Sequence, residues 1–77
     1  MERRARIVEI IRKVSHKEVT PGDDESLFDS GLLDSFTLND MVTEIEKAFS
    51  VKVPGSDLNP RKWDTIERID SYLEGRQ

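Results

Sequence analysis

The sequence predicts an all-α fold: a small bundle of three main helices plus one short helix, with a long loop between the first two main helices. Three segments of the 77-residue chain repeat apolar residues at a helical period of about 3.6. Charged residues cover much of the remaining surface of each segment, so each apolar stripe must be buried against another helix. Two late prolines leave room for one short turn of helix. A chain of this length forms one domain, here residues 1–77.

The first main helix is predicted over residues 3–14. Its apolar residues fall at i, i+3, i+4 and i+7 on one face, and they are Ile7, Ile10, Ile11 and Val14. Charged residues occupy most of the other positions. Arg3, Arg4 and Arg6 are predicted to form a small basic cluster at a solvated end of this helix. The cluster is too slight for nucleic-acid binding.

A loop is predicted over residues 15–34, which contain Pro21, Gly22 and Gly31 and have no long apolar period. A loop of this length is uncommon in a compact domain and needs a structural reason. We predict that its apolar residues pin it across the core, and these are Val19, Leu27, Phe28, Leu32 and Leu33.

The second main helix is predicted over residues 35–49, where the apolar period is clearest. The repeating residues are Leu38, Met41, Val42, Ile45, Ala48 and Phe49. Asp34 is the predicted N-cap, because its carboxylate can accept the free amide hydrogens of the first turn.

The connection after this helix contains Pro54 and Pro60, which break regular structure. The short helix is therefore predicted around residues 56–59. Trp63 follows it, has one polar atom, and is predicted to cap the core.

The last main helix begins after Trp63. Asp64 and Glu67 have the spacing of a capping box, with Asp in place of the usual Ser or Thr. Gly75 is the predicted stop. The buried stripe consists of Ile66, Ile69, Tyr72 and Leu73.

Composition excludes several classes of function. The net charge of −4 argues against nucleic acid or an anionic membrane as a partner. There is no cysteine, and no apolar run approaches the roughly 20 residues of a membrane span. His16 has no nucleophile paired with it, and the acidic residues 22–25 lack the ligand spacing of an EF-hand. We therefore expect a cytoplasmic, monomeric protein that is not an enzyme and has no metal site.

One serine stands out among three Asp-Ser pairs. Ser71 lies inside the last helix, and Ser30 precedes Gly31, where it is expected to support a turn. Ser35 alone lies at the start of a long helix, where amide hydrogens lack partners and the helix dipole is positive. A phosphate ester is favoured there, so Ser35 suits a hydroxyl that becomes phosphorylated or carries a phosphate-linked group.

The neighbours of Ser35 predict an outward face on the same helix. Phe36 falls nearly opposite the buried stripe. It either folds back against Leu32 or Leu33, or it is an exposed anchor for a partner. The face also carries charged and polar residues that would suit a basic partner, namely Asp40, Thr43, Glu44 and Lys47.

The stretch GLLDSF at residues 31–36, followed by this helix, resembles the phosphopantetheine attachment motif of acyl carrier proteins. The resemblance extends along nearly the whole chain, in the order of helices and loop. Within the family it is similar to D-alanyl carrier proteins, in LFDSGLLDSF, in IEKAFSVKVP and in the Trp-Asp-Thr at residues 63–65. It differs from them at Thr37, where they usually have Gly, and at Asn39 and Lys47.

The resemblance implies a non-catalytic carrier. Ser35 would receive 4′-phosphopantetheine from coenzyme A, and the thiol of that arm would hold a carboxylic acid as a thioester. Asp34 would help the phosphopantetheinyl transferase and its metal ion to engage the site. Phe36, Asp40, Thr43 and Glu44 would contact partners. These would be the transferase, an acyl- or aminoacyl-activating ligase, and a downstream acyltransferase or condensing enzyme.

The cargo stays open between D-alanine, for alanylation of cell-wall teichoic acid, and a fatty or polyketide acyl group. The alternative function is a helical interaction module that uses the same helix face and leaves Ser35 unmodified. A small hydrolase is disfavoured, because no base is evident near Ser35 and a core this small leaves little volume for a pocket.

Overall fold

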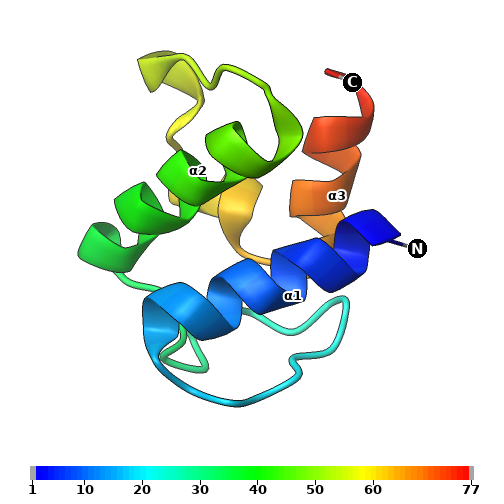
Figure 1. The fold of residues 1–77 in the computed structure, drawn as a ribbon. Helices are drawn as coiled ribbons and strands as arrows, with labels where there is room; N and C mark the ends of the chain where they lie inside the picture. Colours follow the sequence, from blue (N-terminus) through cyan, green and yellow to red (C-terminus); the bar gives the residue numbers. More distant parts are fainter. Residues whose placement is uncertain (1, 77) are drawn as a thin grey trace.

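The computed structural model describes residues 2–76 and confirms the all-α prediction. The elements are α1 (Glu2–Ser15), α2 (Ser35–Phe49), the 3-10 helices η1 (Gly55–Asp57) and η2 (Pro60–Trp63), and α3 (Ile66–Glu74). Helix α1 packs against both α2 and α3, and η2 contacts both α2 and α3 (Figure 1). The long loop between α1 and α2 runs back along α1 and touches the start of α3, where the carbonyl of Asp23 accepts a hydrogen bond of 3.0 Å from the amide of Glu67, before it reaches the start of α2 (Figure 1).

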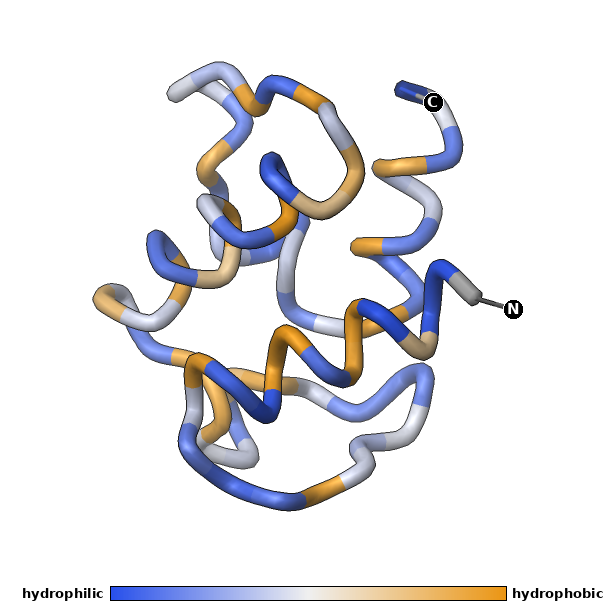
Figure 2. The backbone as a smooth tube through the Cα atoms, in the orientation of Figure 1, coloured by the Kyte–Doolittle hydropathy of each residue, from blue (hydrophilic) through white to orange (hydrophobic). Residues whose placement is uncertain are grey.

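One apolar core joins the helices and the loop. In Figure 2 the hydrophobic positions of α1 lie on the side that faces the other helices, and the hydrophilic positions lie outside. The predicted stripes of α1 and α2 are buried, with Ala48 only partly so. Trp63 is completely buried, so the prediction that it belongs to the core is confirmed. The side chains with essentially no exposed surface are Ile7, Ile11, Leu27, Met41, Ile45, Trp63, Ile66, Ile69 and Leu73.

The connection between α2 and α3 differs from the prediction of one short helix at residues 56–59. It forms two 3-10 turns, and Pro60 begins the second instead of breaking it. Proline is favoured at a first helical position because the missing amide hydrogen would lack a partner there. The side chain of Asn59 caps the same turn by accepting a hydrogen bond of 2.9 Å from the amide of Arg61.

The long loop is pinned as predicted by Leu27, Leu32 and Leu33, which are buried, and by Phe28, which is partly buried. The prediction for Val19 was wrong, because Val19 is 38% exposed. Its backbone is held on the outside of α1, where Arg12 donates to the carbonyl of Val19 at 2.9 Å. Pro21 is the buried residue in this part of the loop.

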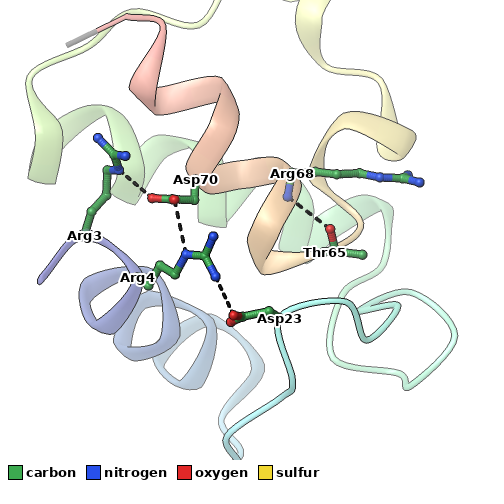
Figure 3. Close-up of polar contacts among 6 residues, drawn as sticks. All are labelled: Arg3, Arg4, Asp23, Thr65, Arg68 and Asp70. Carbon is green, nitrogen blue, oxygen red and sulfur yellow. Dashed lines mark hydrogen bonds and ion pairs between the residues drawn. The ribbon is translucent and has the colours of Figure 1, made fainter. Parts of the chain in front are cut away.

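Asp64 ties the loop to the end of η2, so its predicted capping role was wrong. The carboxylate of Asp64 accepts hydrogen bonds from the Ser26 hydroxyl at 2.8 Å and from the Phe28 amide at 3.2 Å. The N-cap of α3 is Thr65, whose hydroxyl accepts from the Arg68 amide at 3.1 Å (Figure 3). The hydrogen-bond partners of Asp64 lie nearly 40 positions earlier in the chain, which its local spacing to Glu67 could not indicate.

The basic residues at the start of α1 connect this helix to α3 and to the loop, which corrects the prediction of a solvated end. Arg3 and Arg4 both bind the carboxylate of Asp70 on α3, and Arg4 also binds Asp23 in the loop (Figure 3). The hydrogen bond from Arg3 is the largest cause of a lowered pKa for Asp70. Asp70 therefore stays ionised over a wider acidic range than a free carboxyl.

Three of the described residues, His16, Ser50 and Gly31, take left-handed backbone angles, and the last two predict stability changes of opposite sign. Ser50 ends α2 with φ 55°, where glycine is preferred. Gly31 has φ +83°, and a β-carbon at this residue would meet no atom within 4 Å, so alanine there adds only backbone strain. We expect Ser50→Gly to raise the free energy of unfolding by up to about 1 kcal/mol, and Gly31→Ala to lower it by about 1 kcal/mol.

Urea unfolding of both variants measures these changes. Gly75→Ala is the matched control, because Gly75 has φ −75° and needs no left-handed conformation. Destabilisation by Ser50→Gly would contradict the cap assignment.

Candidate functional site

The first turn of α2 is closed by a capping box. Asp34 is the N-cap, as predicted, and its Oδ1 accepts hydrogen bonds of 2.9 Å from the amides of Phe36 and Thr37. The hydroxyl of Thr37 accepts a hydrogen bond of 2.6 Å from the amide of Asp34 in return. Sequence reasoning missed this role of Thr37, although its position three residues after the N-cap is the signal for a capping box.

The capping box leaves fewer amides for a phosphate at this helix start than the sequence predicts. Three of the amides that a helix start leaves unpaired already have acceptors, because the amides of Phe36 and Thr37 donate to the carboxylate of Asp34 and the amide of Asp34 donates to the hydroxyl of Thr37. The predicted set of free amides is therefore wrong for these three. A phosphate on Ser35 would still lie at the positive end of the helix dipole, but it would extend into solvent beside a carboxylate.

Ser35 is the first residue of α2 and is exposed. Its hydroxyl makes no hydrogen bond to any other group in residues 2–76. The hydroxyl of Ser30, by contrast, donates to the carbonyl of Leu27 at 3.2 Å, and the amide of Ser30 donates to the carbonyl of Ser26, which confirms its role in a turn. Of these two Asp-Ser pairs, only the one at Ser35 offers a hydroxyl that a second protein can reach without breaking a bond.

The position of Phe36 decides between the two alternatives predicted for it, folding back on the loop or pointing into solvent. It is 81% exposed, and it does not fold back on Leu32 or Leu33, which are themselves buried in the core. A single exposed apolar residue is ordinary on a protein surface, but an exposed aromatic ring suits the role of an anchor at an interface. It lies next to Ser35, so a protein bound to Phe36 would sit over the serine hydroxyl.

The structure exposes most of the predicted outward face of α2 but places one of its residues against α1. Asp40, Thr43 and Lys47 are exposed, and the hydroxyl of Thr43 donates to the carbonyl of Asn39 at 3.0 Å. Glu44 is only partly exposed and forms an ion pair of 3.2 Å with Lys13 of α1. Glu44 therefore lies at the α1 edge of this face, and Asp40 is the acidic residue fully presented to solvent.

The cap makes the start of α2 sensitive to acid. Hydrogen bonds from the amides of Thr37 and Phe36 lower the pKa of the Asp34 carboxyl. Its folded pKa is then below the unfolded value, so this stabilisation is present above the ordinary carboxyl pKa and is lost as the pH falls through the folded pKa. We expect Asp34→Ala to lower Tm by roughly 4–8 °C at pH 7, and this difference to shrink in acid.

Thermal melts followed by circular dichroism between pH 7 and pH 2 measure the effect. Asp29→Ala is the matched control, because Asp29 also precedes a serine but its exposed carboxylate makes no hydrogen bond within the described chain. An equal loss in both variants, or a difference independent of pH, would contradict the cap.

The fold and the site together define a class of protein: a small helical carrier that presents a serine hydroxyl at the start of its second helix. The family model described as a phosphopantetheine attachment site matches residues 5–70, and the chain belongs to this family. The chain is 35% identical to the D-alanyl carrier protein of Streptococcus sanguinis strain SK36 over 69 residues, which cover 90% of this chain and 87% of the relative. It is 32% identical to the D-alanyl carrier protein of Streptococcus pyogenes serotype M5 strain Manfredo over 71 residues, 92% of this chain and 90% of the relative.

The protein is therefore a carrier, and its cofactor is 4′-phosphopantetheine. The start of α2 fits this group, since Ser35 offers an exposed hydroxyl that makes no hydrogen bond within residues 2–76. Among residues 2–76, no helix has the length and apolar character needed to cross a membrane. The same residues include no group of three His, Cys, Asp or Glu side chains placed to hold a metal ion.

Proposed function

We propose that Ser35 is the residue that carries the phosphopantetheine arm, and that the arm of this carrier is loaded with D-alanine. The observation that supports the site most directly is the unbonded, exposed hydroxyl of Ser35 between the N-cap Asp34 and the exposed ring of Phe36. When bound, the cofactor supplies the thiol that holds a carboxylic acid as a thioester.

The chain's own residues position the hydroxyl and do not activate it. Asp34 uses Oδ1 to hold the first turn of α2, so the Cα of Ser35 is fixed while its side chain stays free. The attacking oxygen needs a base, which the transferase would supply, together with its metal ion. On this proposal the protein is not an enzyme, and it works as a monomer in the cytoplasm.

The proposed docking face consists of Phe36, Asp40 and Thr43, with Glu44 at its edge. Phe36 would insert into an apolar pocket of each partner, since buried aromatic anchors contribute strongly at interfaces. Asp40 would meet a basic residue and orient the partner over Ser35. The partners would be a phosphopantetheinyl transferase, a ligase that activates the cargo, and an acyltransferase that takes it on.

The choice of D-alanine rests on the names of the relatives, which match over about nine tenths of the chain. A fatty or polyketide acyl group is the competing cargo. A D-alanine-activating ligase would form the alanyl adenylate from D-alanine and ATP, releasing pyrophosphate, and would then transfer the alanyl group to the thiol, releasing AMP. The thioester would then be passed to an acyltransferase that modifies cell-wall teichoic acid.

The test loads the purified protein in two steps. It is first treated with coenzyme A and a broad-specificity transferase, and intact mass is expected to rise by one phosphopantetheinyl group. The product is then offered to a D-alanine-activating ligase with ATP and, separately, to a fatty-acyl ligase. We expect a further gain of one alanyl group that hydroxylamine removes, and no gain of an acyl chain.

Loading by the fatty-acyl ligase alone would replace D-alanine by an acyl cargo and leave the site intact. A protein that stays unmodified in the first step, while a control carrier is modified, would overturn the Ser35 proposal. It would favour a plain interaction module that uses the same face of α2.

A further inference from the structure

A second surface feature lies between η2 and α3, away from the first turn of α2. It is a groove lined by Arg61, Lys62, Glu67, Arg68, Ser71 and Tyr72. In Figure 1 the first turn of α2 and the body of α3 lie at opposite sides of the molecule. The groove is therefore not a continuation of the Ser35 site, and the proposed carrier function assigns no role to it.

The charge of the groove is opposite to that of the protein. Its lining has three cations and one carboxylate, whereas the whole chain has a net charge of −4. Some basic side chains are compensated: Arg3 and Arg4 are paired with Asp70, and Lys62 and Arg76 with Asp57. Neighbouring cations repel one another, so a cluster of them attracts an anion that offsets the repulsion, even on a protein with net negative charge.

Two arginines of the groove are without such compensation. Within residues 2–76, Arg61 and Arg68 form no ion pair, although Arg68 donates a hydrogen bond of 2.8 Å to the carbonyl of Arg61. That bond holds two guanidinium-bearing residues side by side. Figure 3 shows the guanidinium group of Arg68 directed away from Arg4 and Asp70, so the carboxylate of Asp70 does not compensate the charge of Arg68.

Asp57 fixes two residues that line the groove, Lys62 and Tyr72. Its carboxylate accepts hydrogen bonds from the Tyr72 hydroxyl at 2.7 Å and from Lys62 at 3.0 Å. The ring of Tyr72 packs on Trp63 with centroids 4.8 Å apart. These bonds, that from Tyr72 first, lower the pKa of Asp57 to about 2, so the carboxylate remains charged in neutral solution. A surface fixed before binding loses less entropy when a ligand arrives.

We propose that this groove binds an acidic segment of a partner protein, with carboxylates on Arg61 and Arg68 and an apolar side chain against the part of Tyr72 that lines the groove. The ring itself packs against Trp63 and has the guanidinium group of Arg76 over it. Arginine suits this task because its planar guanidinium group binds a carboxylate through two parallel hydrogen bonds. A protein segment is favoured over a nucleic acid or an anionic membrane, because the chain's net negative charge repels an extended polyanion while a short segment meets only the local patch.

Because the groove lies away from the first turn of α2, a partner in the groove and an enzyme at Ser35 could bind at the same time. A partner bound there would hold the carrier while Ser35 and Phe36 stayed accessible to a different enzyme. Binding in the groove depends neither on which cargo the carrier holds nor on whether Ser35 is the modified residue.

The test uses a synthetic peptide that alternates glutamate with leucine around one tyrosine, titrated into the isotope-labelled full-length protein and followed by amide chemical shifts. We expect the shifts to concentrate at residues 61–62 and 67–72 and to weaken with added salt. The double variant Arg61→Glu and Arg68→Glu is expected to weaken binding about tenfold or more. Both side chains are exposed, and the alanine pair provides a milder second variant.

The matched control is Lys17→Glu with Lys52→Glu, which makes the same change in net charge at exposed residues outside the groove. We expect it to change the affinity by less than about twofold. Equal weakening in both double variants would overturn the proposal, because attraction would then depend on net charge alone. It would also be overturned if phosphatidylglycerol vesicles or an oligonucleotide shifted these amides and the peptide did not.

Discussion

Replacing Ser35 with alanine is expected to abolish the gain of one phosphopantetheinyl group completely, while the protein stays folded. The hydroxyl of Ser35 makes no hydrogen bond within residues 2–76 and is exposed, so its loss removes an attachment point and almost no stability. Alanine also keeps a high helix propensity at the start of α2. Intact mass after treatment with coenzyme A and a transferase measures the modification, and circular dichroism confirms the fold.

Ser30→Ala is the matched control, because Ser30 also follows an aspartate and lies five residues before Ser35 in the same loop-to-helix region. It loses a hydrogen bond of 3.2 Å to Leu27, so we expect a small loss of stability and full modification. Modification that persists in Ser35→Ala and disappears in Ser30→Ala would move the site to the turn.

Replacing Trp63 with alanine is expected to have the largest effect on stability, a loss of about 3–5 kcal/mol. Trp63 has no exposed surface, and its indole nitrogen donates to the carbonyl of Asp57 at 2.8 Å. Alanine would leave a cavity between η2 and α3 and an acceptor without its donor. A domain of this size has roughly 4–12 kcal/mol of total stability, so the variant would be largely unfolded or close to it.

Phe36→Ala is the comparison that separates packing from docking. Phe36 is also aromatic but is 81% exposed, so we expect its removal to change the free energy of unfolding by less than about 0.5 kcal/mol. Urea unfolding of both variants measures the difference. The same Phe36→Ala protein is expected to be modified by the transferase much more slowly than the wild type. A large stability loss for Phe36→Ala would contradict its outward position.

On these proposals the protein has two separate contact surfaces. One is the groove between η2 and α3, and the other is the first turn of α2. The first turn of α2 offers an aromatic ring and an acid next to Ser35, the proposed attachment residue, which suits basic partners that act on the arm. The groove offers arginines, which suits an acidic partner that holds the carrier. Charge reversal in the groove is therefore expected to leave modification of Ser35 unchanged, and Phe36→Ala to leave binding of the acidic peptide unchanged.

The sequence by itself determined the three main helices and the candidate serine. The boundaries predicted for α2 at residues 35–49 match the structure, and Asp34 was correctly identified as its cap. Both depend on contacts within four residues along the chain, which a period and a capping residue encode directly. Ser35 could be chosen among three serines for the same reason, since the start of a long helix is a local property.

Only the tertiary structure decided how polar residues are used. The pairing of Arg3 with Asp70 joins positions 67 residues apart, and Asp64 serves the loop at Ser26 and Phe28 instead of capping α3. No periodicity along the chain indicates which helix an ion pair will reach. The outward position of Phe36 and the pair of uncompensated arginines also depend on which neighbours the fold brings near, because burial and charge compensation are properties of packed surfaces and not of sequence spacing.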